Sequence, residues 1–248
     1  MQRFENRVVL IVGGNSGIGL ATAKLFADEG AKLVIAGRDV EAGNAAVGSL
    51  PSSSEARFVK TDVRMTDSVA QLVDETVKAF GRIDVAFNNA GWESAMLPLA
   101  DTSETDWHKM IDIKLNGVWR GMKYQLPQMV KQGGGAIINM SGNWGLVGAA
   151  NFSAYCAAAH GVMGVTKAAA LEYISAGIRV NAVCPGAVDT AIFDRIVGMS
   201  EEIKKAVGEG FAIGRICTPE EVAKTVVFLA SDDASYINGV GLVMDGGS

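Results

Sequence analysis

Short apolar runs rich in β-branched residues alternate along this chain with longer segments of helical periodicity. The apolar runs predict strands over residues 7–12, 32–37, 56–63, 84–91, 135–142, 178–186 and 241–247. Most of these runs are apolar at consecutive positions, which is typical of parallel strands that are covered on both faces. The intervening segments predict helices over residues 17–30, 67–81, 103–133 and 153–177, several of which end in glycine, as helices often do.

The repeated alternation of strand and helix predicts βαβ units joined by right-handed crossovers. Such units build an α/β fold in which a doubly wound parallel sheet lies between two layers of helices. The length of 248 residues suits one α/β domain, and no stretch has the composition of a linker. We therefore expect a single three-layer αβα domain over residues 1–248.

Composition and charge exclude several classes of partner. The chain has 22 basic and 27 acidic residues, and its basic residues form neither a run nor a stripe, so we expect neither nucleic acid nor an anionic membrane as a partner. The opening apolar run is far too short for a secretion signal or a membrane span. The three cysteines, Cys156, Cys184 and Cys217, are widely spaced without a metal-like pairing, which predicts reduced thiols, a cytoplasmic location and no metal site.

The first predicted strand runs through a glycine-rich loop directly into a helix. In this loop Gly14 permits a tight turn, Gly17 lets the backbone approach a pyrophosphate, and Gly19 allows the helix to pack closely on the sheet. The N-terminus of the helix offers free N–H groups and the positive end of its dipole to phosphates. This strand–turn–helix context predicts nucleotide binding by Gly13, Gly14, Asn15, Ser16, Gly17, Ile18 and Gly19.

The end of the second predicted strand bears on the kind of nucleotide. An acidic residue directly after this strand would accept hydrogen bonds from the adenosine ribose and repel a 2′-phosphate. Gly37 stands there instead and is followed by Arg38, which suits a 2′-phosphate. Asp39 comes next, so a solvated Arg38–Asp39 turn without a binding role is the alternative. We expect NADP as the cofactor, held in part by these two residues, with NAD as the alternative.

Further short motifs follow the glycine loop in a fixed order. They are "DV" at residues 62–63, "NNAG" at 88–91, the tyrosine of "SAYCAAAHG" at 153–161, "PGAVDT" at 185–190 and "DGG" at 245–247. With the glycine loop, this ordered set resembles the short-chain dehydrogenase/reductase family over essentially the whole chain. One departure is Gly13, where the family usually has threonine.

The resemblance implies a Rossmann-like fold, a nicotinamide cofactor, a small-molecule carbonyl or alcohol substrate and, usually, a homotetramer. It places two residues by the adenine of the cofactor, three by a ribose and four by the nicotinamide. In that order they are Asp62 and Val63, then Asn89, Ala90 and Gly91, then Pro185, Gly186, Val188 and Thr190.

The family's active site combines an asparagine, a serine, a tyrosine and a lysine, and only the tyrosine, Tyr155, is present in this chain. Ala159 stands at the lysine position, Gly142 at the serine position and Lys114 at the asparagine position. A free phenol titrates near pH ~10, so a tyrosine that transfers protons near neutrality needs a nearby cation. The family's lysine normally supplies that charge.

The sizes of the three exchanged residues form a pattern. Two side chains are shortened, at Gly142 and Ala159, and a long amine is added at Lys114. In a close-packed site this exchange creates room and then partly fills it. We therefore expect Lys114 to point into the space vacated beside Tyr155, the alternative being that it extends to solvent, as most lysines do. We interpret the pattern as a rebuilt active site, made by engineering or by natural divergence.

Three functions are compatible with these residues. In the first, the chain is an NAD(P)-dependent oxidoreductase in which the charge of Lys114 supports proton transfer by Tyr155. In the second, Lys114 is a nucleophilic amine that forms a Schiff base with a carbonyl substrate, as in aldol or retro-aldol chemistry. In the third, the chain binds the cofactor without catalysis.

The substrate is expected next to the cofactor and catalytic segments. Residues 191–211 resemble the family's variable lid over the substrate, the alternative being a surface helix with a solvated "EEIKK" face. Ordinary packing is the alternative for the aromatic residues of the expected pocket. The expected pocket residues are Trp92, Glu93, Gly142, Trp144, Ala159 and Phe193.

Overall fold

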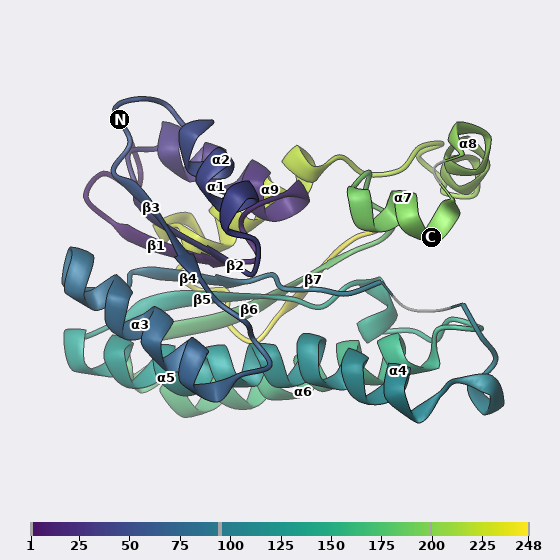
Figure 1. Cartoon of the computed structure of the whole chain (residues 1–248). Coiled ribbons are helices and arrows are strands. Elements are labelled where there is room, and N and C mark those ends of the chain that lie inside the picture. Colours follow the sequence, from purple (N-terminus) through teal and green to yellow (C-terminus); the bar gives the residue numbers. More distant parts are fainter. Residues whose placement is uncertain (1, 94–95, 199, 248) are drawn as a thin grey trace.

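The strands form one parallel sheet. The structure, a computed structural model, describes residues 2–93, 96–198 and 200–247. In this described part of the chain, seven parallel strands follow the order β3-β2-β1-β4-β5-β6-β7 across the sheet (Figure 1). Their bounds are Val8–Val12 for β1, Lys32–Gly37 for β2, Ala56–Lys60 for β3, Val85–Asn88 for β4, Gly135–Met140 for β5, Ile178–Pro185 for β6 and Gly241–Met244 for β7. The order changes direction between β1 and β4, which confirms the doubly wound sheet.

Helices cover both faces of this sheet (Figure 1). One layer consists of α1 (Gly17–Asp28), α2 (Val40–Gly48) and α9 (Pro219–Ala230), and the other of α3 (Thr66–Phe80), α5 (Gly117–Gln132) and α6 (Ser153–Tyr173). Successive strand residues point to opposite faces. In β1, Val9 and Ile11 therefore join the first core, and Leu10 and Val12 join the second. Both faces are buried, as the consecutive apolar positions predicted, and the single three-layer α/β domain is confirmed.

The helix predicted over residues 103–133 is interrupted at its centre. The helix α4 (Glu104–Met110) is followed by a π-helical turn over Ile111–Asn116 and then by α5. A π-helical turn carries an extra residue, so the positions that face inward shift within it. The consecutive residues Ile113 and Lys114 are both buried there, with 5% and 3% of their surface exposed. Periodicity predicted the helix but not this turn.

Two further differences concern helices near the C-terminal half. The strand and helix pattern did not identify α9, although Thr218 forms a capping box with Glu221 and Pro219 opens the helix. Residues 191–211 contain two helices, α7 (Ala191–Val197) and α8 (Glu201–Glu209), while Met199 within this range lies outside the described residues. Among the described helices, none has both the length and the apolar character that crossing a bilayer requires.

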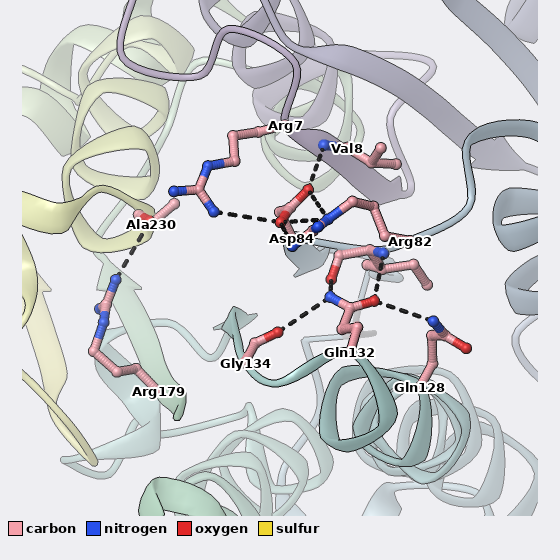
Figure 2. A network of polar contacts seen from close by, with 10 residues as sticks. Arg7, Val8, Arg82, Asp84, Gln128, Gln132, Gly134, Arg179 and Ala230 are labelled. Carbon is pink, nitrogen blue, oxygen red and sulfur yellow. Dashed lines mark hydrogen bonds and ion pairs between the residues drawn. The ribbon is translucent and has the colours of Figure 1, made fainter. Parts of the chain in front are cut away.

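A polar network fixes the amino ends of the strands (Figure 2). Asp84, which is 5% exposed, accepts a hydrogen bond from the backbone N–H of Val8 at 2.9 Å. The same carboxylate pairs with Arg82 at 2.7 Å and with Arg7 at 3.4 Å. Gln132, the last residue of α5, bonds through its amide to both the N–H and the carbonyl of Ile83. These contacts tie β1, β4 and α5 together at the amino end of the sheet.

We predict that Asp84→Ala lowers the free energy of unfolding by about 1–3 kcal/mol, because it leaves a buried N–H of Val8 without an acceptor. Asp84→Asn should lower it less, because its amide oxygen can still accept from Val8. Urea denaturation measures both. Asp74→Ala, on the exposed side of α3, is the control and should stay within about 0.5 kcal/mol of the wild type. Equal stability of the Asp84→Ala and Asp74→Ala variants would contradict this role.

Candidate active site

A cleft of about 1110 Å³ opens at the carboxyl ends of the strands. Its walls come from the segments that follow β1 to β6 and from α7 and α8. Ligands of open parallel sheets bind in this place, next to the point where the strand order reverses. The cleft brings together most of the residues singled out in the sequence. Those that line it are Gly13, Asn15, Ser16, Gly17, Ile18, Arg38, Asp39, Asp62, Val63, Asn89, Ala90, Gly91, Trp92, Lys114, Trp144, Tyr155, Pro185, Gly186, Val188, Thr190 and Phe193.

The glycine loop forms one end of the cleft. Gly13 and Gly17 have positive φ angles of +76° and +48°, which favour glycine at both positions. Asn89 donates a hydrogen bond through Nδ2 to the carbonyl of Gly13 at 2.9 Å and so fixes the loop to the end of β4. The N-terminal residues of α1, Gly17 and Ile18, line the cleft, so the N–H groups of the first turn face a bound anion there.

Gly14 and Gly19 shape this loop from beneath and do not line the cleft. A Cβ at Gly14 would lie 2.9 Å from Cγ2 of Ile35. A Cβ at Gly19 would collide with the carbonyl oxygen of Gly13. These two glycines therefore set the shape of the turn and allow the close packing of α1.

The segments after β2 and β3 lie next to the glycine loop and complete this end of the cleft. The carboxylate of Asp39 is the N-cap of α2 and accepts from the N–H of Ala42 at 3.0 Å. Asp62 pairs with Arg64 at 2.6 Å, and the hydrogen bond from Arg64 is the main reason why the pKa of Asp62 is lowered. The charge of Arg38 lowers that pKa further. Asp39 thus caps the helix through Oδ1, and both Arg38 and Asp39 line the cleft.

Lys114 and Tyr155 lie side by side in the cleft. Lys114 is 3% exposed, and its Nζ lies 4.4 Å from the centroid of the Tyr155 ring. Nζ also donates to the carbonyl of Met140 at 3.5 Å, and the hydroxyl of Tyr155 donates to the next carbonyl, that of Ser141, at 3.2 Å. No carboxylate of the described residues forms an ion pair with Lys114. The amine therefore points into the site and not to solvent.

Aromatic side chains surround the phenol. The ring of Trp144 packs edge-on against Tyr155, with 5.6 Å between centroids, and lies 4.3 Å from the ring of Phe152. The ring of Trp92 carries the ammonium of Lys109 at 3.5 Å from its centroid. The further apolar residues that line the cleft are Met96, Val147, Ile192, Phe193, Ile196, Ile203, Val207 and Phe211. This end of the cleft suits an apolar substrate.

The helices α7 and α8 are held by ion pairs on the side of the cleft. Lys204 on α8 pairs with Asp194 on α7 at 2.5 Å and with Asp189 at 3.0 Å. These acidic partners, Asp194 first, raise the pKa of Lys204. Arg195 on α7 pairs at 3.0 Å with Glu93 on the segment after β4. The "EEIKK" segment is therefore not simply a solvated face, because Lys204 bridges the two helices.

Comparison with known proteins agrees with the fold and the cleft. A family model described as enoyl-(acyl carrier protein) reductase matches residues 12–248. The cis-4-hydroxycyclohexanecarboxylate dehydrogenase of Sinomonas cyclohexanicum is 41% identical over 246 residues, which cover 99% of this chain and 98% of that protein. The cyclohexanol dehydrogenase of Acinetobacter sp. (strain SE19) is 39% identical over 245 residues, 98% of this chain and 95% of the other. The crystal structure of levodione reductase superimposes with a TM-score of 0.95 at 36% identity and covers 98% of both chains.

The chain belongs to the short-chain dehydrogenase/reductase family. The assignment covers the whole domain, since the matched residues extend from β1 to the end of the chain. It also identifies the chain as a member of a family of oxidoreductases. The Rossmann-like doubly wound fold expected from the resemblance is confirmed.

Two of the altered positions in this short-chain dehydrogenase/reductase lie behind the cleft wall, contrary to their predicted place in the pocket. Gly142 has a φ of +107°, and a Cβ there would collide with the hydroxyl of Tyr155. Ala159 has no exposed surface, and its carbonyl accepts a hydrogen bond from the hydroxyl of Ser141 at 3.0 Å. Tyr155 thus covers the first position and Ser141 the second, so neither lines the cleft.

Glu93 was also predicted to line the pocket and does not. Its carboxylate turns to Arg195, and it is Arg195 that lines the cleft. Arg195 was not among the predicted site residues, nor was the apolar lining of α7 and α8 apart from Phe193. The signal for the apolar lining was present: Ile192 and Ile196, like Ile203 and Val207, are spaced by one helical turn.

Restoring the family's serine at position 142 should disturb this site. We predict that Gly142→Ser lowers the free energy of unfolding by about 1–3 kcal/mol, because a non-glycine residue at this positive φ is strained and meets the Tyr155 hydroxyl. Urea denaturation measures the change. Gly148→Ser is the matched control, because a Cβ there meets no atom within 4 Å. Should Gly142→Ser be as stable as Gly148→Ser, the backbone at Gly142 does not require glycine.

Proposed function

We propose that this protein is an NAD(P)-dependent oxidoreductase that interconverts an apolar, ring-containing alcohol and its ketone through a rebuilt active site. The observation that carries the proposal is the buried Nζ of Lys114, 4.4 Å from the centroid of the Tyr155 ring. It is supported by relatives whose names specify cyclohexanol and a hydroxycyclohexanecarboxylate as substrates. The aromatic and aliphatic lining beside Tyr155 suits such rings.

The residues of the cleft fit a dinucleotide. A Cβ at Gly13 would lie 3.0 Å from the backbone nitrogen of Ala90, so glycine lets the loop pack closely against the segment after β4, and this loop would receive the pyrophosphate. The N-terminus of α1 supplies N–H donors to it. The residues expected beside the adenine, a ribose and the nicotinamide all line this one cleft. They are Asp62, Val63, Asn89, Ala90, Gly91, Pro185, Gly186, Val188 and Thr190. When bound, the nicotinamide supplies or accepts the hydride.

Tyr155 would hold the proton of the reaction. Its hydroxyl donates to the carbonyl of Ser141, and a substrate oxygen that enters the cleft would replace this acceptor. As the substrate carbonyl is reduced, its oxygen takes the proton of the Tyr155 hydroxyl and a phenolate is left. The ammonium of Lys114, beside the ring, stabilises that phenolate in a site shielded from water. Lys114 thereby replaces the charge that the family's lysine supplies from position 159.

The first test concerns these two side chains. Tyr155→Phe should lower kcat/KM for NADPH-dependent reduction of cyclic ketones by about 10²–10⁴, because the proton donor is lost. Lys114→Met should lower it by a similar factor, while the dissociation constant of NADPH changes by less than about threefold. Steady-state NADPH oxidation with a panel of cyclic ketones measures the rates. Tight cofactor binding by the wild type without turnover above background would instead support a non-catalytic dinucleotide-binding protein.

NADP is the proposed cofactor. Asp39 caps α2 through one carboxylate oxygen, Oδ1, and Arg38 in the cleft offers a cation to a 2′-phosphate. We predict that Arg38→Ala weakens NADP binding about 10- to 100-fold and NAD binding less than about threefold. Isothermal titration with each cofactor measures this. Arg57→Ala is the control. Arg57 lies on β3, its guanidinium packs 5.1 Å from the centroid of the Phe80 ring, and it does not line the cleft. Tighter binding of NAD than of NADP by the wild type would contradict the proposal.

We further propose a homotetramer in the cytoplasm, with residues 191–211 as a lid over the substrate. Large apolar side chains stay exposed on the single chain, including Leu171 at 80% and Trp119 at 46%. Such surfaces are typical of contacts between subunits. The three free cysteines fit a reducing compartment. Light scattering after size-exclusion chromatography measures the oligomeric state.

A further inference from the structure

We propose that Lys114 also forms a reversible imine with small apolar aldehydes and ketones. This activity uses the same cleft as the proposed oxidoreductase but requires neither a cofactor nor hydride transfer. The proposal rests on the environment of the Lys114 amine and on the part of the cleft in front of that amine.

The environment of Lys114 differs from that of other lysines in the described chain. Lys32 pairs with a carboxylate at 2.9 Å, and Lys204 pairs with three. Lys114 is 3% exposed, and its partners are one backbone carbonyl at 3.5 Å and the face of an aromatic ring. A lysine withdrawn from water and without a carboxylate partner is the kind that proteins use as a carbonyl nucleophile.

The space in front of the amine suits a carbonyl compound with an apolar body. Lys114 lines the cleft together with the ring of Tyr155, the ring of Trp144 and the ring of Phe152. These groups bury an aliphatic or alicyclic body and restrict water near the nitrogen, which slows hydrolysis of an imine. The chemical class of the ligand is therefore an uncharged aliphatic or alicyclic aldehyde or ketone.

The reaction is a condensation and needs no further reactant. The nitrogen of the neutral amine attacks the carbonyl carbon, a C–N bond forms as the C=O π bond breaks, and the carbonyl oxygen takes up one of the two protons of that nitrogen. The resulting carbinolamine then expels its hydroxyl group as water while a proton leaves the nitrogen. The net change is one amine and one carbonyl converted to one imine and one water, and water reverses it.

The test traps the imine on the protein without cofactor. The wild type is incubated at neutral pH with cyclohexanecarbaldehyde and sodium cyanoborohydride, whose hydride reduces the imine to a stable secondary amine. Peptide mass spectrometry then locates the adduct. We expect Lys114 to be labelled at least about 10-fold faster than Lys123, an exposed lysine nine residues further along the same helical segment. Labelling of Lys123 and other exposed lysines without Lys114 would overturn the proposal.

Matched variants separate this activity from the proposed oxidoreductase. Lys114→Arg keeps a positive charge but cannot form the imine, so the fast labelling should be lost, and Lys114→Met should lose it as well. Lys123→Arg should leave it unchanged, and circular dichroism checks that each variant is folded. Labelling of Lys114 in a protein that does not oxidise NADPH with any ketone would support the imine and refute the oxidoreductase. NADPH oxidation without labelling of Lys114 would refute the imine and support the oxidoreductase.

Discussion

The burial of one amine against one phenol ring is the constraint on which the rest of the site depends. Withdrawing an ammonium from water without a counter-ion costs several kcal/mol. A desolvated cation over a tyrosine ring returns about 2 kcal/mol, and a hydrogen bond to a carbonyl adds to it. For Lys114 both contacts are present, with Tyr155 and with the carbonyl of Met140. The rest of the desolvation cost must be offset by favourable packing elsewhere in the fold. Selection for stability alone would therefore not favour a buried lysine at this position.

The carboxyl end of β5 makes this arrangement feasible. Inside a sheet each carbonyl pairs with a neighbouring strand, but beyond the last ladder residue carbonyls need other donors. At this end the carbonyl of Met140 accepts from Lys114 and that of Ser141 accepts from Tyr155. Consecutive carbonyls thus hold the two functional groups next to each other. The same edge of the sheet carries the glycine loop and the segments after β4 and β6, so the fold brings binding and chemistry to one place.

Local patterns account for what could be predicted from the sequence. The strands follow from consecutive apolar positions, the glycine loop from its place between β1 and α1, and the place of Lys114 beside Tyr155 from the sizes of the exchanged residues. Features set by distant contacts were not predictable. The π-helical turn at Ile111–Asn116 does not change the residue types along the helix, whereas the cap of α2 by Asp39 is a local feature, since aspartate is favoured at N-caps. The pairing of Glu93 with Arg195 joins segments about one hundred positions apart.

The geometry also couples Gly142 to Tyr155 and Lys114. The hydroxyl of Tyr155 occupies the direction in which a side chain at Gly142 would extend, and Ser141 fills the space beside the backbone of Ala159. The space in which a side chain at Gly142 would lie is thus already occupied by the phenol of Tyr155. A serine at position 142 would displace the side chain of Tyr155. The face of the Tyr155 ring would then no longer lie against Lys114. Residues that share one close-packed space do not act additively. A side chain at position 142 therefore affects Tyr155 and, through the ring of Tyr155, Lys114.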